Sequence, residues 1–416
     1  MTDYHLVQSY LQERLPRYLE LHRQMVEINS FTANPAGVNA LAQYTARVFA
    51  ELGFEAEDVP SADERYGRHL FLSNRGRARG GVSLALISHL DTVFPPEEEA
   101  ANAFFWRVDG ERIYGPGTVD IKGGTALIYM LLDGIRKFFP EVYETTNFWV
   151  CLNATEEVLS DEFARLCLER LPRNTRACLV FEGGTPAGEE YSLVVARKGR
   201  ATYKVSVEGR AAHAGNNHHL GANALVQLAH TVQKIAAMTD YQRKITFNVG
   251  TMTGGVVVNR VPHQAEAEVE MRAFSLDVFE QGVSDMLALN GSSDVSSRDG
   301  YPCKVRVELM ERTAPFPRNP ATQGLFSIWE QAATSLGMRV TPEERGGLSD
   351  ANLLWQAFPT LDGLGPVGAN AHCSEYSPDG SKEPEYVQLS SFVPKCLLNI
   401  VAILNLIHQP ETAQRL

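Results

Sequence analysis

The sequence predicts an α/β fold in which a mostly parallel sheet is flanked by helices and a smaller α+β domain is inserted. Up to about residue 195, apolar runs alternate with helical segments, as in a parallel sheet built from βα units. From about residue 198, polar and apolar residues alternate, which is typical of antiparallel strands with one wet face. After residue 317 the pattern returns to helix, strand and helix. We therefore predict a larger domain, residues 1–197 and 313–416, and an insert, residues 198–312.

The elements of the larger domain follow from its apolar segments. Helices are expected near residues 4–28, 37–53 and 125–132. Apolar runs with few charges fit strands that are buried on both faces. Four segments have this character: residues 81–91, 148–157, 177–184 and 358–365.

The insert shows a different pattern of polar and apolar residues. Strands with alternating polarity are expected at residues 199–208, 264–273 and 304–311. Helices are expected near residues 222–238, where apolar residues recur at helical spacing, and near residues 276–289.

Side chains that bind metals follow the buried strands. They are His89, Asp91, Glu156, Glu157, Glu182 and His372, together with Asp120 in a glycine-rich turn. Open α/β sheets bind ligands at the carboxyl edge of their strands, so we expect these side chains to meet there. If Asp91 and one glutamate of the Glu156–Glu157 pair are not ligands, two His and three acidic residues remain, which are too many for one tetrahedral ion and indicate two ions about 3.5 Å apart that share a carboxylate. Zinc is the default, and Co²⁺ or Mn²⁺ can substitute because no thiolate is needed.

In two pairs of neighbouring residues, one residue can bind metal while the other has a supporting or catalytic role. His89 can bind metal while Asp91 accepts a hydrogen bond from its second ring nitrogen. One of the two adjacent glutamates, Glu156 and Glu157, can bind a cation while the other moves protons. Cys373 follows a proposed ligand, and we interpret it as a wall residue because the other ligands are hard.

Composition excludes several other classes of protein. The 416 residues are 44% hydrophobic and 21% charged, as in a soluble globular protein. A net charge of −12 argues against a nucleic-acid partner. The charged N-terminal segment lacks the apolar core of a signal peptide, and we expect no apolar run that spans a membrane. Six scattered cysteines without CxxC spacing fit reduced thiols, so we expect a cytoplasmic protein.

Seven motifs together resemble a known family. They are HLDTV at residues 89–93, GPGTVDIKGG at 115–124, ATEE at 154–157, FEGG at 181–184, GRAAHAG at 209–215, GGLSDAN at 346–352 and AHCSEY at 371–376. They resemble the di-zinc co-catalytic metallopeptidases, which include glutamate carboxypeptidase, aminoacylase, succinyl-diaminopimelate desuccinylase and peptidase T. The match extends over nearly the whole chain and is nearest to the glutamate carboxypeptidase-like members. It implies a zinc-peptidase-like catalytic domain with an inserted lid that also forms a homodimer.

The resemblance assigns roles to the metal-binding residues. It implies that Asp120 bridges both metals and that the peptide bond after it is cis. Glu157 and His372 would complete one site, and His89 and Glu182 the other. Asp91 would orient His89, and Glu156 would be the general base.

The resemblance also assigns substrate contacts. His213 would reach the active site of the partner subunit and stabilise the oxyanion. Asn259 and Arg272 would hold the substrate's carboxylate, although an ordinary exposed arginine is an alternative. We also expect Gly346, Gly347 and Ser349 to contact the substrate, because the glycine pair can present backbone N–H groups to an anion.

We therefore expect a metal-dependent, carboxypeptidase-like amide hydrolase. It would release a C-terminal amino acid from a short peptide or an N-acyl amino acid by attack of a metal-bridging water, with Glu156 as general base. One alternative is an N-acyl amino acid deacylase of the aminoacylase or desuccinylase type. Another is a catalytically silent dimeric metal-binding protein, against which the intact Glu156 argues.

Overall fold

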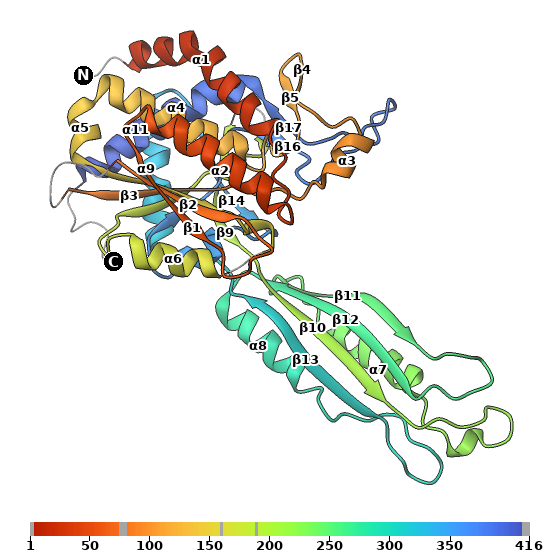
Figure 1. Ribbon diagram of the computed structural model, residues 1–416. Helices are drawn as coiled ribbons and strands as arrows, with labels where there is room; N and C mark the ends of the chain where they lie inside the picture. Colours follow the sequence, from red (N-terminus) through yellow and green to blue (C-terminus); the bar gives the residue numbers. More distant parts are fainter. Residues whose placement is uncertain (1–3, 75–80, 159–160, 188–189, 410–416) are drawn as a thin grey trace. The chain divides into compact units, whose positions relative to one another are not determined.

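The computed structural model describes residues 4–74, 81–158, 161–187 and 190–409 (Figure 1). Its internal contacts divide the chain into two compact units. The first comprises residues 1–195, 318–344 and 349–416, and the second comprises residues 196–317 and 345–348. Residues 196–197, 313–317 and 345–348 were predicted in the larger domain but cluster with the second unit. Residues 345–348 are held there because Arg345 O accepts the Lys198 N–H at 3.0 Å and Arg197 donates to the carbonyl groups of Gly347 and Leu348.

A six-stranded mixed sheet forms the centre of the first unit, in the order β1-β2-β6-β3-β7-β15. Its strands are β1 (Glu55–Pro60), β2 (Arg68–Ser73), β3 (Ser83–His89), β6 (Asn147–Asn153), β7 (Ala177–Val180) and β15 (Thr360–Leu361). The β6, β3, β7 and β15 strands run parallel, whereas β1 and β2 are antiparallel additions at one edge. Every residue of β3 is buried, as its continuous apolar sequence predicts.

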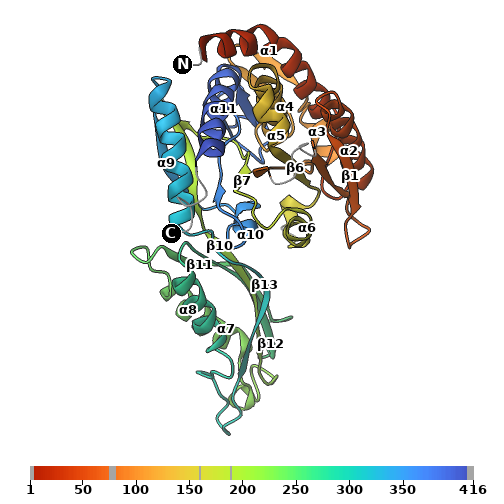
Figure 2. The same ribbon diagram turned by 90° about the vertical axis from the view of Figure 1, so that its left-hand side faces the viewer.

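The helices of the first unit cover both faces of this sheet or lie in the connections between its strands. They are α1 (Tyr4–Val26), α2 (Pro35–Ala50), α3 (Pro96–Ala101), α4 (Lys122–Phe138), α5 (Pro140–Thr145), α6 (Glu162–Arg170), α9 (Pro320–Ser335), α10 (Ala351–Leu354) and α11 (Phe392–His408). Figure 2 shows α1, α4 and α11 on one side and α6 on the other. The α4 helix is buried along most of its length and contacts α1, α11 and β3. The predicted α/β fold class is confirmed.

The C-terminal helix corrects one expectation from the sequence. The segment Leu389–His408 is long and apolar enough to cross a membrane, contrary to our expectation that no run in the chain would be. In the fold, 78% of its most apolar window is buried, because α11 packs against α1, α4 and α9. Its hydrophobicity is therefore that of a core helix.

Shorter strands complete the first unit and its connections. One four-stranded sheet has the order β16-β17-β5-β4, and a three-stranded sheet has the order β14-β9-β8. Their strands are β4 (Arg107–Asp109), β5 (Arg112–Tyr114), β8 (Pro186–Ala187), β9 (Glu190–Arg197), β14 (Val340–Arg345), β16 (Gly368–Ala369) and β17 (Tyr386–Gln388). Short 3₁₀ helices lie at Glu156–Val158, His218–Leu220 and Leu389–Ser391.

The second unit is an antiparallel sheet with two helices on one face. The strands have the order β11-β12-β10-β13. Their bounds are β10 (Gly199–Glu208), β11 (Ile245–Gly254), β12 (Gln264–Ala273) and β13 (Lys304–Thr313), and the helices are α7 (Ala224–Ala237) and α8 (Leu276–Leu287). Buried positions alternate along β10 and β12, as the sequence predicts. The alternation does not predict β11, an edge strand whose second half is exposed.

Candidate metal centre

The parallel strands bring predicted ligands to one edge of the large sheet. His89 is the last residue of β3, and Glu156 and Glu157 lie in the 3₁₀ turn that follows β6. Glu182 follows the end of β7 by two residues. Because β3 pairs in parallel with both β6 and β7, the carboxyl ends of the strands coincide.

Two further ligands come from loops. Asp120 lies just before α4, and the peptide bond between Asp120 and Ile121 is cis, which confirms the expectation from the resemblance. His372 lies between β16 and β17 with a positive φ of 67°.

The two oxygens of Asp120 face different histidines. Asp120 Oδ1 lies 3.1 Å from His89 Nε2, and Asp120 Oδ2 lies 3.2 Å from His372 Nε2. Glu182 Oε1 is 3.8 Å from His89 Nε2, and Glu157 Oε2 is 3.3 Å from His372 Nε2. Each trio, Asp120 with His89 and Glu182 or Asp120 with Glu157 and His372, has ligand atoms within 4.8 Å of one another. A shared carboxylate between two trios is the geometry of a site for two metal ions.

Glu156 occupies a position different from that of its neighbour. Its Oε2 lies 3.9 Å from His89 Nε2, so it borders the cluster, and its side chain is 9% exposed. A third trio of His89, Glu156 and Glu157 also has ligand atoms within 4.8 Å. The two Asp120 trios account for all five predicted ligands, which leaves Glu156 as a carboxyl group beside them.

Asp91 organises the glutamate turn more than the histidine ring. His89 Nδ1 donates to the backbone oxygen of Asp91 at 2.9 Å, and the Asp91 carboxylate lies farther away, at 3.5 Å. That carboxylate instead accepts the backbone N–H groups of Glu156 and Glu157 at 3.1 and 3.2 Å and the Thr32 hydroxyl at 2.9 Å. The Asp91 carboxylate thus lies within ion-pair distance of the ring, as expected, but its shorter hydrogen bonds go to the glutamate turn and to Thr32. The main chain of Asp91 binds the ring, and its carboxylate fixes both glutamates.

Burial and mutual repulsion set the protonation of the cluster. Burial raises the pKa of Glu156 well above its ordinary value, and Glu182 and Glu157 add to this shift although His89 opposes it. Burial also raises the pKa of Glu157 to about 7, with Asp120 contributing. Hydrogen bonds to Asp120 and Glu157 raise the pKa of His372 to about 11. The cluster concentrates more negative charge than its histidines balance, an environment that suits bound cations.

Sequence reasoning missed part of the support around the cluster. Asp350 is buried, and its Oδ1 accepts the Asn153 side-chain amide at 2.8 Å. Burial raises the pKa of Asp350 to about 7. The GGLSDAN motif includes Asp350, but the motif gave no sign of its partner 197 residues away. Glu385, also fully buried, had no sequence signal.

Ser349 was expected to contact substrate. Its side chain is fully buried and donates to Asp362 Oδ2 at 2.9 Å, and its backbone N–H donates to Asn352. The structure therefore corrects this expectation, because Ser349 stabilises its own turn and presents no exposed atom.

In the second unit, His213 and Asn259 lie side by side. Residues 213 and 260 form a bridge, and the Ala214 N–H donates to Asn259 O at 2.9 Å. His213 Nδ1 accepts the N–H groups of Gly215 and Asn216, each at 3.1 Å. The hydrogen of the neutral ring is therefore on Nε2, which leaves His213 as an exposed hydrogen-bond donor.

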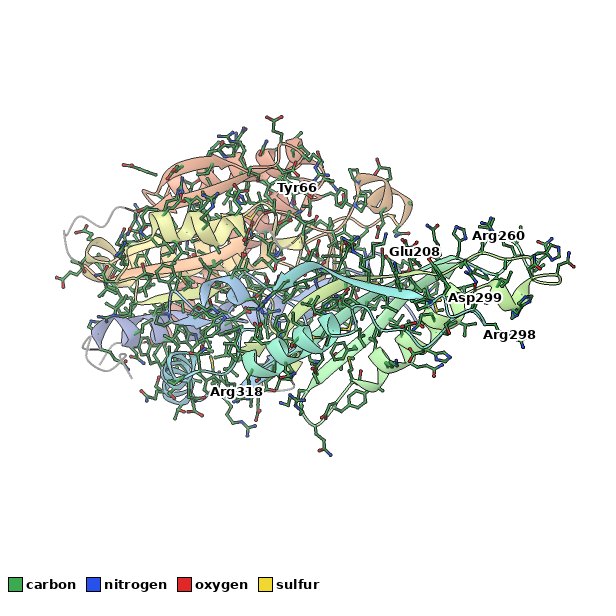
Figure 3. The ribbon with its side chains drawn as sticks, turned by 90° about the horizontal axis from the view of Figure 1, so that it is seen from below. Tyr66, Glu208, Arg260, Arg298, Asp299 and Arg318 are labelled. Carbon is green, nitrogen blue, oxygen red and sulfur yellow. The ribbon has the colours of Figure 1, made fainter. Side chains whose placement is uncertain are left out.

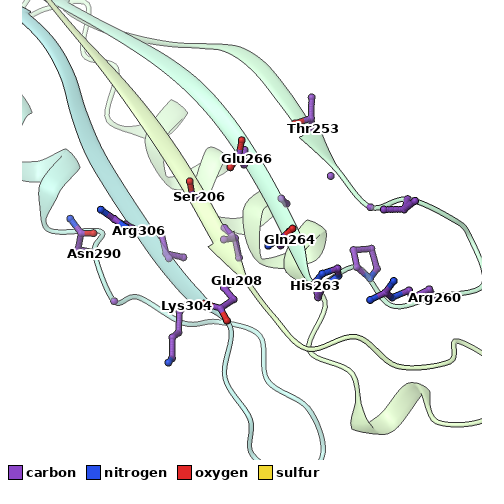
Figure 4. Close-up of a pocket in the computed structure, with 18 residues that line it drawn as sticks. Ser206, Glu208, Thr253, Arg260, His263, Gln264, Glu266, Asn290, Lys304 and Arg306 are labelled. Carbon is purple, nitrogen blue, oxygen red and sulfur yellow. The ribbon is translucent and has the colours of Figure 1, made fainter.

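The segment that carries His213 is anchored by Arg210. Its guanidinium pairs with Asp299 and binds Ser297 Oγ at 3.0 Å. Figure 3 shows Asp299 and Arg260 at the same end of the second unit. A groove of about 910 Å³ opens there between the ends of the strands (Figure 4). Its lining includes Glu208, Arg260, His263 and Lys304, and it contains none of the metal-ligand trios.

Arg272 lies near the end of β12, and its guanidinium is engaged. It forms two hydrogen bonds with the Glu270 carboxylate, at 2.6 and 3.2 Å, and a third with Gly346 O at 2.7 Å. Gly347 O accepts from Arg197. The predicted glycine pair is thus held through its carbonyl oxygens.

Comparisons with known proteins agree with this architecture. Residues 195–290 match the model of the M20 peptidase dimerisation domain. The chain is 27% identical to carboxypeptidase G2 from Pseudomonas sp. over 388 residues, which cover 92% of this chain and 87% of that protein. It is 26% identical to acetylornithine deacetylase from Yersinia pseudotuberculosis over 384 residues, with 86% and 91% covered.

Solved structures show the same fold. Aminopeptidase PepT from Bacillus cereus superposes with a TM-score of 0.74 at 20% identity, covering 95% of this chain and 99% of that one. The Bacillus subtilis YXEP protein, a dinuclear metal-binding peptidase, gives 0.67 at 15% identity, with 96% and 99% covered. Sequence motifs, fold and relatives agree in their similarity to metal-dependent peptidases and amidohydrolases of the M20 family, whose dimerisation domain matches residues 195–290.

Proposed function

We propose that this protein is a carboxypeptidase-like amide hydrolase with two zinc ions, which releases a C-terminal amino acid from a short peptide or an N-acyl amino acid. The observation that carries the proposal is Asp120, whose two oxygens face His89 and His372 while the buried Glu156 stands beside the cluster. One relative is a carboxypeptidase and another is a deacetylase. We consider both reactions for this protein: release of a C-terminal amino acid and removal of an acyl group.

The donor chemistry fits zinc. Two imidazole nitrogens and three carboxylates provide ligands of the kinds that Zn²⁺ binds in proteins. Asp120 would bridge, His89 and Glu182 would hold one ion, and Glu157 and His372 would hold the other. When bound, such a pair of ions activates water at neutral pH and polarises a substrate carbonyl.

Glu156 is suited to proton transfer in this reaction. Its backbone N–H is fixed by the Asp91 carboxylate, so its carboxyl is held at the border of the cluster. We assign it the role of taking a proton from the attacking water and delivering it to the departing amine. The Asp91 carboxylate binds the backbone N–H groups of both glutamates and would thereby fix the distance between Glu156 and Glu157.

The lid residues support a site shared between two copies of the chain. His213 and Asn259 lie near the start of β12, whereas Arg272 lies near its end. From Gln264 to Arg272 the strand extends roughly 26 Å, which exceeds the length of a dipeptide. This separation supports contributions from two copies of the chain to one small substrate. We propose a homodimer through the lid, in which His213 Nε2–H stabilises the oxyanion in the partner's site and Arg272 serves its own.

Subunit mixing tests this arrangement. His213→Ala and Glu156→Gln proteins should each be inactive alone, and exchange should restore activity, because a mixed dimer contains one site with both residues. At most about a quarter of wild-type activity per chain is expected if half the dimers are mixed. Mixing either protein with the doubly substituted chain is the matched control, because that pairing leaves no intact site. Demonstrated exchange without recovery would refute the shared site.

A substrate panel separates the peptidase from the deacylase. Zinc-loaded protein should cleave N-acyl amino acids or dipeptides that have a free α-carboxylate, and kcat/KM should fall at least about tenfold for the α-carboxamides if Arg272 binds that group. Arg272→Gln should remove this difference. If kcat/KM depends on the acyl group and is the same for the free acid and its α-carboxamide, the result would favour the deacylase. No cleavage by protein with both metals bound would support the silent binding protein.

We also propose that the protein functions in the cytoplasm. All six cysteines are free thiols, and five of them are buried. Cell fractionation with an antibody to the chain tests this proposal, and recovery in a secreted fraction would refute it.

A further inference from the structure

A buried glutamate outside the ligand set contacts the main chain next to two ligands. Glu385 precedes β17 and is fully buried. Its Oε1 accepts the backbone N–H groups of Val119 at 2.8 Å and Asp120 at 3.1 Å. Its own N–H donates to the carbonyl of Cys373 at 2.7 Å. Since Cys373 follows His372, a single residue connects the main chain at Asp120 with the main chain at His372.

The segment that Glu385 holds is also enclosed by packing. A Cβ atom at Gly183 would lie 2.3 Å from Val119 Cγ2, and one at Gly368 would lie 2.7 Å from the same atom. The backbones around Gly183 and Gly368 thus press on the Val119 side chain. Packing limits the lateral position of the segment, and the hydrogen bonds to Glu385 fix the direction of its N–H groups.

Packing alone does not require an acidic side chain at position 385. Glu385 Oε2 is buried and has no hydrogen-bond partner among the described residues. Burying a carboxyl group with an unsatisfied oxygen is costly, and an apolar residue of similar size often serves a scaffold at least as well. The cost indicates that the side-chain oxygen acceptor is kept for its contacts with the backbone of the bridging ligand.

We propose that Glu385 is a positioning residue for the metal centre. Its carboxylate fixes the main chain of Asp120 and its N–H fixes the chain after His372, so that these two ligands keep the separation that a shared ion needs. This inference rests on the proposed function only in requiring that metals bind the cluster. Groups that hold ligands in place commonly change metal affinity 10- to 100-fold when removed.

Metal binding, measured without turnover, tests the proposal. Glu385→Leu removes the acceptor at similar size, and we expect its Zn²⁺ affinity, measured by chelator competition, to fall about 10- to 100-fold for at least one ion. The visible absorption spectrum of the Co²⁺-loaded protein should change as well. Glu385→Gln keeps an oxygen acceptor and should restore affinity to within about threefold of wild type.

Asp133→Leu is the matched control. Asp133 is a poorly exposed carboxylate on α4 that accepts the Tyr10 and Tyr18 hydroxyls at 3.0 and 2.6 Å. It lies about 16 Å along the helix from Lys122, the first residue of α4. This variant should have a lower Tm but unchanged Zn²⁺ affinity and Co²⁺ spectrum.

The outcomes separate the two proposals. Wild-type affinity and spectrum in Glu385→Leu would overturn the positioning role and leave the proposed function intact. Wild-type protein that fails to bind two metals would overturn both. If Glu385→Leu does not fold, Glu385→Asp replaces it: the shorter side chain should bind Zn²⁺ more weakly than Glu385→Gln, and equal affinity in these two variants would overturn the proposal.

Discussion

Asp91→Ala is expected to destabilise the first unit and to weaken metal binding. Asp91 is 1% exposed, and its carboxylate accepts three hydrogen bonds, from the Thr32 hydroxyl and from the backbone of Glu156 and Glu157. Alanine leaves the two backbone N–H groups without this acceptor, and the Thr32 hydroxyl keeps only its longer hydrogen bond to Thr92 O at 3.3 Å. The turn that carries both glutamates would then lose its anchor.

The size of the effect follows from these bonds. A hydrogen bond to a charged group contributes about 1.5–3 kcal/mol, and part of that sum is offset because the buried carboxylate no longer has to be desolvated. We expect a loss of about 3–5 kcal/mol for Asp91→Ala. Thr32→Val removes only one donor at nearly constant volume and should cost about 1 kcal/mol. Zn²⁺ affinity in Asp91→Ala should fall about 10- to 100-fold because both glutamates become mobile.

Urea unfolding measured by tryptophan fluorescence is the appropriate assay. All four tryptophans, at positions 106, 149, 329 and 355, belong to the first unit, so the signal reports that unit alone. Chelator competition gives the Zn²⁺ affinity of the same samples. The reasoning is refuted if Asp91→Ala shifts the unfolding midpoint no more than Thr32→Val does and binds Zn²⁺ with wild-type affinity.

Three further predictions use the same preparations. Glu156→Gln should keep both metals but lose at least about a hundredfold in kcat, because only proton transfer is removed; metal analysis with steady-state kinetics checks this. Glu157→Ala should instead lose metal, and the reverse pattern would mean that the two roles are exchanged. Burial lowers the pKa of His22 to about 3, so the unfolded chain binds more protons between pH 6.5 and 3 and stability falls as the pH falls. Between pH 7 and pH 5, the free energy of unfolding measured in urea should fall by about 2 kcal/mol less for His22→Leu than for wild type. Equal falls in the two proteins would contradict this prediction.

The sequence predicts those features that repeat along the chain. Alternation of polar and apolar residues predicts β10 and β12, because one face of that sheet packs against helices and the other meets water. The apolar runs of β3, β6 and β7 predict a buried parallel sheet, and polar residues at their ends predict the ligand edge. The exposed edge strand β11 escapes detection because few of its side chains are buried.

Support for the site depends on contacts that sequence does not encode locally. Glu385 binds the N–H of Val119, 266 residues away, and Asp350 binds Asn153. A backbone N–H has the same chemistry at every residue, so no residue type marks it as a partner. The sequence also does not show that the backbone oxygen of Asp91 binds His89 while its carboxylate binds the glutamate turn, because both groups belong to the same residue.

Anomalous X-ray scattering at the zinc edge, from crystals of the zinc-loaded protein, tests the central claim most directly. Two peaks are expected, about 3.5–4 Å apart, with Asp120 in contact with both. His89 and Glu182 should lie at one peak and Glu157 and His372 at the other. A single peak, or peaks that Asp120 does not join, would contradict the account.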